Sequence, residues 1–295
     1  MTTGLYLKVL SYNVKMLPGI FGRGDDDLSR ADRIATQLLA RDDDVVALQE
    51  VFDETVRARL VARLGAAFPH RIDKSGDGLF DEDSGLMLLS RHAFAGEPLF
   101  FEWDQSGPLW TSDRWADKGV QLARLQLPGD FELVVGNVHL QADYEPRKYA
   151  HVRAAQIEQL AGLVGRTLAP TRRPHSVAAL VVGDFNVDGG SDEHRAMLST
   201  LRGARDLWAC AHPDDPGYTV DPEVNTMAER SDPRQRLDLA IAFDALAAER
   251  LGGSPPLARL EARQLQVLRL AEEGRSLSDH DALAVHVEIG EPPAV

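Results

Sequence analysis

The chain has 295 residues and is 44% hydrophobic, so it is long enough to bury a full core as one large α/β domain. Its formal net charge of −14 at pH 7 argues against a broad surface that neutralises nucleic-acid phosphates, although a local basic patch is compatible with it. Cys210 is the only cysteine, so an intramolecular disulfide and a thiolate-rich zinc site are excluded, and we expect Cys210 to be a small buried residue.

The N-terminal residues show no export signal. MTTGLYLKVLSYNV has neither a long apolar core nor a small-residue cleavage site. The sequence as it stands therefore predicts a cytoplasmic protein, while a secreted protein would look the same after removal of a signal peptide. No apolar run approaches about 18 residues, so we expect no transmembrane segment. The sequence does not predict an oligomeric state.

Strand-like and helix-like segments alternate along the first and middle parts of the chain. The first helical segment places Ile34, Leu38 and Leu39 on one face, which is the period of an α-helix. The alternation predicts mixed sheets covered by helices, in a single domain that spans residues 1–295. Residues 244–275 stay open between helix and strand, because GGSPP breaks the chain there. In chain order, the expected elements are strand 6–14, helix 28–41, strand 44–51, helix 54–68, strands 84–91, 120–127 and 131–140, helix 148–168, strand 176–186, helix 192–204, and strands 236–243 and 282–289.

The segment VVGDFNVDGG, residues 181–190, places an acid and an amide two residues apart at the end of an apolar strand. Successive side chains of a strand point to opposite faces, so Asp184 and Asn186 should point the same way. Their oxygens suit a hard cation or a phosphoryl group. The alternative is a strand that ends in an Asx turn, because Asp, Asn and Gly are common turn residues.

The same pattern recurs at most strand ends, and this decides between the two interpretations. The residues are only Asn, Asp, Glu and His, whereas turn chemistry would also supply Gly, Ser and Pro. Ligand sites in sheet proteins gather beyond strand ends, and metal-assisted phosphoester hydrolysis needs convergent carboxylate, amide and imidazole groups. The polar residues at the strand ends are Asn13, Glu50, Asn137, His139, Asp184, Asn186, Asp238, Asp279 and His280.

Five short motifs carry a resemblance to a known family. In order they are SYNV, LQEV, GNVHL, GDFN and SDHDAL, and they extend from about residue 7 to residue 288. The set resembles the endonuclease/exonuclease/phosphatase superfamily. The resemblance implies a four-layer α/β sandwich, in which two packed mixed β-sheets are flanked by helices and the active site lies at the sheet edges.

The resemblance implies a metal site. Glu50 would be the carboxylate that binds an essential Mg²⁺ or Mn²⁺, with Asn13 nearby as a second ligand or a positioning amide. Asp279 would be an accessory acid near the metal. Such a set agrees with the chemistry of Mg²⁺, which keeps several waters and is often held by one or two carboxylates together with substrate phosphate.

The resemblance also implies catalytic roles. His280 would be the general base that activates water, oriented by Asp238. Asp184 and Asn186 would position the nucleophile and stabilise the pentacovalent phosphorus, and His139 would bind a phosphoryl oxygen or assist the leaving group. A histidine is well matched to accepting a proton from water near neutral pH, and a neighbouring carboxylate fixes its tautomer.

Simpler structural roles stay open for several of these residues. Asp238 could pair with Arg236 or Arg234, Asn137 could hold a loop, and Glu50 could be a solvated charge at a strand end. A binding module that keeps the fold without catalysis should have lost at least one essential residue of the site, and none is lost.

Several details resemble the neutral sphingomyelinases within this superfamily. They are NVKMLPG, QEVFD, NVHLQAD and WADKGV, in which Lys118 could approach a phosphate or could be an ordinary strand-entry lysine. The aromatic segment 98–115 suits a membrane interface and a buried core about equally. We therefore expect a Mg²⁺-dependent phosphodiesterase that acts on a sphingomyelin-like phospholipid, which a membrane surface could present. The alternatives are a metal-dependent endo- or exonuclease, which the acidic charge disfavours, and an inositol-phosphate phosphatase.

Overall fold

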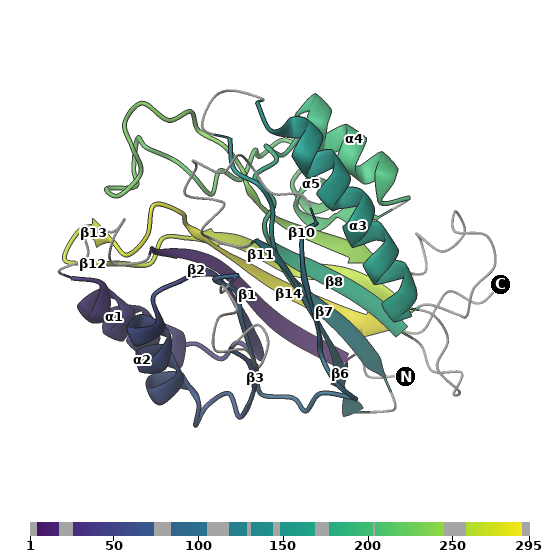
Figure 1. Ribbon diagram of the computed structural model, residues 1–295, viewed down its shortest axis with the longest axis horizontal. Coiled ribbons are helices and arrows are strands. Elements are labelled where there is room, and N and C mark those ends of the chain that lie inside the picture. The colour runs from purple at the N-terminus through teal and green to yellow at the C-terminus, as the bar shows by residue number, and fades with distance from the viewer. Residues whose placement is uncertain are drawn as a thin grey trace.

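The computed structural model describes residues 5–17, 26–73, 84–104, 118–128, 131–143, 148–168, 177–202, 204–244 and 258–290. Two six-stranded mixed sheets pack face to face, and helices cover the outer face of each (Figure 1). The predicted four-layer α/β sandwich is confirmed. Among the described helices, none is both long enough and apolar enough to cross a bilayer.

The first sheet has the strand order β11–β14–β1–β2–β4–β3, and within it β1 and β2 are the parallel pair. Helices α1 and α2 pack on its outer face (Figure 1). The elements of this half are β1 (Leu5–Met16), α1 (Asp27–Leu39), β2 (Val45–Val51), α2 (Glu54–Leu64), β3 (His70–Ile72), β4 (Met87–Ser90), β11 (Arg259–Leu268) and β14 (Ala282–Gly290).

The second sheet has the order β5–β6–β7–β8–β10–β9, and within it β7 and β8 are the parallel pair. Helices α3 and α4 cover its outer face (Figure 1). The elements of this half are β5 (Leu99–Glu102), β6 (Gly119–Gln126), β7 (Glu132–His139), α3 (Ala150–Leu168), β8 (Val177–Asp184), α4 (Asp192–Thr200), β9 (Arg205–Asp206), α5 (Leu207–Ala211) and β10 (Asp238–Phe243). A small separate hairpin pairs β12 (Ala271–Glu272) with β13 (Arg275–Ser276).

Three apolar clusters separate the four layers. The middle cluster lies between the sheets and includes Val45, Leu180 and Val285. The other two lie under the helices, where Ile34 of α1 and Ile157 of α3 are among the buried residues. Strands buried on both faces form near-continuous apolar runs, and this is why the strand segments could be read from the sequence.

The structure also shows which element forms in one segment that the sequence left open between helix and strand. Residues 259–268 form the strand β11, which pairs antiparallel with β14. Leu260 and Leu265 are buried in the cluster between the sheets, and a register shift between Ala262 and Gln264 allows both to face the core from this edge strand. Part of the open segment, 245–257, lies outside the described residues.

The aromatic segment 98–115 is only partly described. Trp103 packs in the cluster under α3, is 7% exposed and donates its indole N–H to the carbonyl oxygen of His139 at 2.8 Å. Trp103 therefore belongs to the core. Trp110 and Trp115 lie outside the described residues.

Candidate active site

The eight predicted site residues lie at one edge of the sandwich. The carboxyl ends of β1, β2, β7 and β8 reach this edge, and the antiparallel strands β10 and β14 begin there. Asp184 shows the convergence most directly, because it is paired with His139 in β7 and with Asp238 in β10. The residues gathered at this edge are Asn13, Glu50, His139, Asp184, Asn186, Asp238, Asp279 and His280.

Asn13 links the two sheets at the site. Its Nδ2 donates a hydrogen bond to Oε1 of Glu50 and another to Oδ2 of Asp184, each at 3.0 Å. Its Oδ1 accepts from the backbone N–H of Lys15 at 3.1 Å. Because Glu50 belongs to the first sheet and Asp184 to the second, this buried amide fixes the spacing of two carboxylates from different layers.

The GDFN segment forms an Asx turn and also contributes to the candidate site. Oδ1 of Asp184 accepts from the backbone N–H of Asn186 at 2.8 Å, while Oδ2 faces Asn13. Asn186 has a φ of 50° and donates its side-chain N–H to the carbonyl oxygen of Leu140 at 3.0 Å. At Gly183, φ is 141° and a Cβ atom would lie 2.1 Å from the carbonyl oxygen of Val138, so only glycine fits. The two interpretations of the sequence are therefore compatible.

Glu50, His139 and Asp184 form a group that could hold a metal ion. One potential ligand atom from each lies within 4.8 Å of the others. Nε2 of His139 is 3.8 Å from Oε1 of Glu50 and 3.5 Å from Oδ2 of Asp184. The His139 side chain is buried, and among the described residues neither ring nitrogen has a hydrogen-bond partner. An unsatisfied imidazole between two carboxylates fits a bound cation or a substrate oxygen.

The local charges agree with a cation at this place. Burial raises the pKa of Glu50, and Asp279 raises it further. Burial, Asp238 and Glu50 raise the pKa of Asp184 to about 6, against the opposing effects of His280 and Lys118. A divalent cation would favour the ionised form of both carboxylates and so remove this penalty. Glu50 also has a φ of 57°, a backbone conformation that is strained for this residue type and is common at functional sites.

His280 is oriented by Asp238. Nδ1 of His280 lies 2.8 Å from Oδ2 of Asp238, which is fully buried. A carboxylate can only accept, so Nδ1 carries a proton, and in the neutral imidazole the lone pair lies on Nε2, 3.9 Å from Oδ2 of Asp184. Burial alone would lower the pKa of His280, but Asp238, Asp184 and Asp279 together raise it well above its ordinary value.

The alternative partners of Asp238 are engaged elsewhere. Arg236 forms an ion pair with Asp206 at 2.8 Å, and Arg234 forms one with Asp221 at 2.9 Å. Asp238 is therefore paired with the histidine and not with either arginine.

His139 differs in its electrostatics from His280. Burial, together with Lys118 and His280, lowers the pKa of His139 well below its ordinary value. The imidazole is therefore neutral at neutral pH. Lys118 is buried, and it affects the pKa of Glu50 and Asp184 as well. The lysine that the sequence singled out thus lies near the site.

Asp279 lies outside the group of three potential metal ligands. Its Oδ2 is 2.6 Å from Nζ of Lys15. Burial tends to raise the pKa of Asp279, but His280 and Lys15 outweigh it and lower the pKa. Sequence reasoning missed Lys15, although it follows Asn13 by two residues in the same strand.

Sequence reasoning also missed Arg30, a buried residue of α1. Its Nη1 donates to the carbonyl oxygens of Val14 and Leu277, and its Nη2 donates to that of Lys15. The signal that could have revealed it is its helical spacing from Ile34, which places a charged residue on the apolar face.

Asn137 has a structural role between the sheets. Its Nδ2 donates to the carbonyl oxygen of Leu48 at 2.9 Å, and its Oδ1 accepts from Nε2 of Gln49 at 2.7 Å. Both partners are in β2, whereas Asn137 is in β7. Asn137 therefore joins the sheets beneath the site and does not hold a loop.

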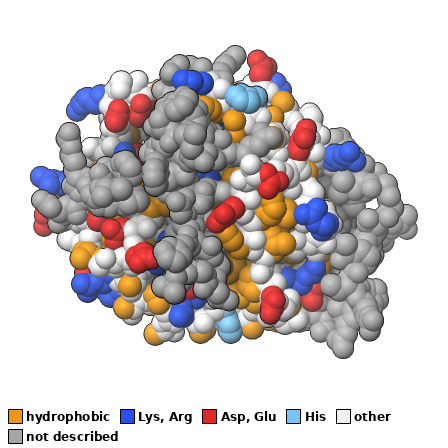
Figure 2. Space-filling model, in the orientation of Figure 1, with side chains coloured by type: hydrophobic (Ala, Val, Ile, Leu, Met, Phe, Trp, Pro, Cys, Tyr) orange, Lys and Arg blue, Asp and Glu red, His pale blue; other side chains and the backbone are white. Residues whose placement is uncertain are grey.

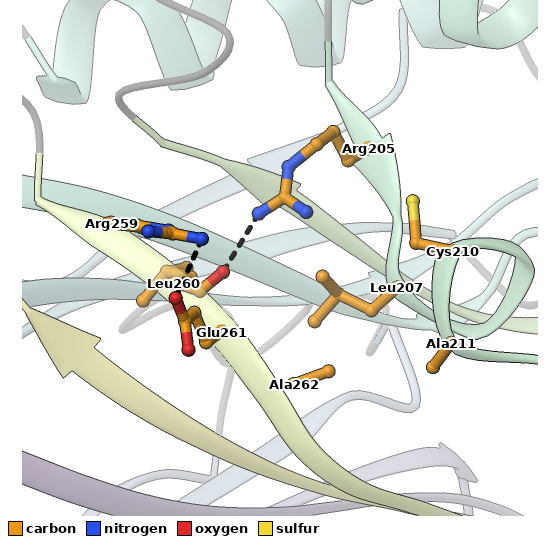
Figure 3. Close-up of a pocket in the computed structure, with 8 residues that line it drawn as sticks. All are labelled: Arg205, Leu207, Cys210, Ala211, Arg259, Leu260, Glu261 and Ala262. Carbon is orange, nitrogen blue, oxygen red and sulfur yellow. Dashed lines mark hydrogen bonds and ion pairs between the residues drawn. The ribbon is translucent and has the colours of Figure 1, made fainter. Parts of the chain in front are cut away.

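The expectation that Cys210 is buried is wrong. Cys210 is exposed, and it lines a 270 Å³ cavity between α5 and β11 (Figure 3). In that cavity Arg205 donates to the carbonyl oxygen of Leu260 at 2.8 Å, and Arg259 pairs with Glu261 at 2.7 Å. Leu207 and Trp208 form the buried side of the five-residue helix α5, and Cys210 is not on that side. None of the predicted site residues lines this cavity.

Comparisons with known proteins agree with this geometry. The model of the Endonuclease/Exonuclease/phosphatase family matches residues 10–280. The chain is 25% identical to sphingomyelinase C of Bacillus cereus over 264 residues, which cover 80% of this chain and 74% of that protein. It is 26% identical to a candidate neutral sphingomyelinase of Drosophila melanogaster over 97% of this chain, and it spans 61% of the length of that relative.

Solved structures show the same fold. Sphingomyelinase C from Streptomyces griseocarneus has a TM-score of 0.71 at 23% identity, and the alignment covers 96% of this chain and 99% of that one. TDP2 of Danio rerio, complexed with a single-strand DNA product, has a TM-score of 0.69 at 17% identity, with 96% and 98% covered. The match of the family model shows that the chain belongs to the Endonuclease/Exonuclease/phosphatase family, and the relatives it matches include sphingomyelinases and phospholipases C.

Proposed function

We propose that this protein is a Mg²⁺-dependent phosphodiesterase that hydrolyses a choline-type phospholipid such as sphingomyelin, with His280 as the general base. The observation that carries the proposal is the position of the His280–Asp238 pair beside the group of Glu50, His139 and Asp184. The proposed base His280, the carboxylates that could bind a cation and the buried imidazole of His139 thus lie close together.

Glu50 would be the principal ligand of Mg²⁺, and Asn13 would orient it through the hydrogen bond to Oε1. The bound cation would supply charge for the developing negative oxygens of the phosphate. Carboxylate oxygens are the ligands that Mg²⁺ prefers, and Asp184 adds a second carboxylate close to the first. The role of Asp279 as an accessory acid stays a prediction.

The proton would move from the attacking water to Nε2 of His280. Asp238 accepts from Nδ1–H, so the lone pair of the neutral imidazole lies on Nε2, and a water that contacts both Nε2 and Oδ2 of Asp184 would give its proton to Nε2. Asn186 would keep Asp184 in place through the turn that joins them. His139, neutral at working pH, would donate an N–H to a phosphoryl oxygen or to the leaving group.

The choice of a lipid rests on the sphingomyelinase relatives and on surface charge. Acidic and basic side chains are interspersed on the face shown in Figure 2, without a continuous basic stripe among its described residues. The net charge of −14 points the same way, because affinity for a polyanion depends on many phosphate contacts. A nuclease of the same fold is the second candidate, since TDP2 of Danio rerio shares the architecture.

A substrate screen tests the proposal. Purified protein would be incubated with Mg²⁺ and separately with sphingomyelin micelles, lysophospholipids, plasmid DNA and inositol phosphates, with and without excess EDTA. We expect phosphocholine release from sphingomyelin that EDTA abolishes and that Glu50→Gln nearly abolishes. Full activity after exhaustive chelation would contradict the metal mechanism, and rapid DNA nicking without any lipid product would favour the nuclease.

A further inference from the structure

Lys15 brings an ammonium group into the acidic edge of the site. Its Nζ lies 2.6 Å from Oδ2 of Asp279, a distance typical of a charge-assisted hydrogen bond. The two side chains are 32% and 22% exposed, so the contact is largely shielded from solvent. The partner is a site acid and not a distant surface residue.

The backbone of Lys15 is held in an unusual conformation. Its φ is 49°, which is uncommon for a residue with a long side chain and persists only where surrounding contacts impose it. Its N–H donates to Oδ1 of Asn13 at 3.1 Å, and its carbonyl oxygen accepts from Nη2 of Arg30 at 2.7 Å. Both peptide groups of Lys15 are thus fixed by site-forming residues.

Arg30 also fixes the segment that carries Asp279. Its Nη1 donates to the carbonyl oxygen of Leu277 at 2.7 Å, and Asp27 accepts from its Nη2 at 2.7 Å. Leu277 precedes Asp279 by two residues. One buried guanidinium therefore sets the relative position of both members of the Lys15–Asp279 pair.

The carboxylate of Asp279 is committed to this pair. The potential metal ligands that approach one another are Glu50, His139 and Asp184, and Asp279 is not among them. A divalent cation at Asp279 would have to displace the ammonium or lie against its positive charge, and both are unfavourable in a partly buried site.

We propose that Lys15 is a built-in cation of this active site, which neutralises Asp279 and limits the site to one divalent ion, held by the carboxylates of Glu50 and Asp184. Arg30 acts as the positioning residue for Lys15. The inference rests on the proposed function for the existence of that one ion, and it adds the number of ions and the residue that sets it.

Counting bound Mn²⁺ tests the inference without an activity assay. The purified full chain and its variants would be titrated with Mn²⁺, and the free ion would be measured by electron paramagnetic resonance. We expect one Mn²⁺ per chain for the wild type and for Lys15→Arg, which keeps the charge. Lys15→Met, which keeps the approximate length but loses the charge, should bind a second ion, and Lys15→Met combined with Asp279→Asn should return to one.

A second variant covers the case in which Lys15→Met does not fold. Asp279→Asn alone should keep one Mn²⁺ at unchanged affinity, because Asp279 does not hold the ion. Two ions in the wild type, a folded Lys15→Met with one ion, or a tenfold loss of affinity in Asp279→Asn would each overturn the inference. An absence of Mn²⁺ binding to the wild type would instead contradict the proposed function, and the inference with it.

Discussion

His280 and Asp238 come from different sheets, and their side chains meet with Nδ1 and Oδ2 2.8 Å apart. His280 precedes β14 of the first sheet, and Asp238 opens β10 of the second. The proposed base and the group that orients it are therefore brought together only when the two halves of the sandwich have packed.

Asp238→Asn should change the pH profile as well as the rate. Asp238 favours the protonated form of His280 and so raises its pKa. Without that charge the pKa falls, and His280 stays neutral to lower pH, so the acid limb of the kcat profile should move to lower pH. The plateau should fall by about tenfold or more, because the tautomer is no longer fixed. A pH–rate series on both proteins measures this, and an acid limb that moves upward would contradict the pairing.

His280→Ala should lower kcat by about 10²- to 10⁴-fold, which is the usual contribution of a general base. Substrate binding should suffer much less, because the imidazole acts on the water. Steady-state kinetics separates the two effects. His92→Ala is a matched control, since His92 lies 3.6 Å from Asp44 at a place that carries none of the predicted site residues. A His280→Ala variant with only a raised KM would assign the histidine to binding.

Asp184→Asn should make the stability of the metal-free protein less dependent on pH while it depresses turnover. The folded-state pKa of Asp184 is about 6, above the value of about 3.9 for an unfolded chain, so folding favours the protonated form. Stability from this group is therefore present at low pH and is lost as pH rises through about 6, by at most about 3 kcal/mol.

Thermal unfolding in EDTA between pH 4 and pH 8 checks the Asp184 prediction. The difference in Tm between Asp184→Asn and the wild type should grow with pH, and Mg²⁺ should reduce it by stabilising the wild type. Circular dichroism would establish that the variant is folded. A folded variant with full turnover would restrict Asp184 to its turn.

Substrate preference is expected to follow surface charge. At physiological salt, the protein should cleave a choline-type phosphodiester in micelles faster than it nicks plasmid DNA. Lowering the ionic strength should not reverse the order, because the acidic surface repels a polyanion more strongly when screening is weak. Product analysis by mass spectrometry beside a gel-based nicking assay gives the comparison.

The fold could be predicted because its strands are buried on both faces. Segments such as 177–182 are apolar throughout, and the polar residues that interrupt this pattern mark the strand ends. β11 was not predicted, because an edge strand with one exposed face carries charged residues that also suit a helix. Its antiparallel pairing with β14 makes the segment a strand, and the residue pattern of 259–268 alone does not show that pairing.

The acidic, amide and imidazole residues of the candidate site could be predicted from the sequence, but two of its basic residues could not. Polar strand ends suggested Glu50 and Asp184, and both lie where the strands converge. Lys15 and Arg30 were missed because their partners are far away in sequence: Asp279 for the first, and the carbonyl oxygen of Leu277 for the second. Cys210 was misjudged because its exposure depends on which side of α5 packs on the core, and Leu207 and Trp208 occupy that side.

Because Asn13 bonds to both Glu50 and Asp184, the geometry of the site depends on how the two sheets are aligned. If one sheet slid past the other by about 1 Å, the fold could survive but the reacting groups would no longer match, and such a displacement can cost about 10²-fold in rate. Leu180 and Val285 belong to the packed layer between the sheets, which helps to keep that alignment although its side chains are apolar. Substitutions in this layer between the sheets should therefore lower the catalytic rate before they prevent folding.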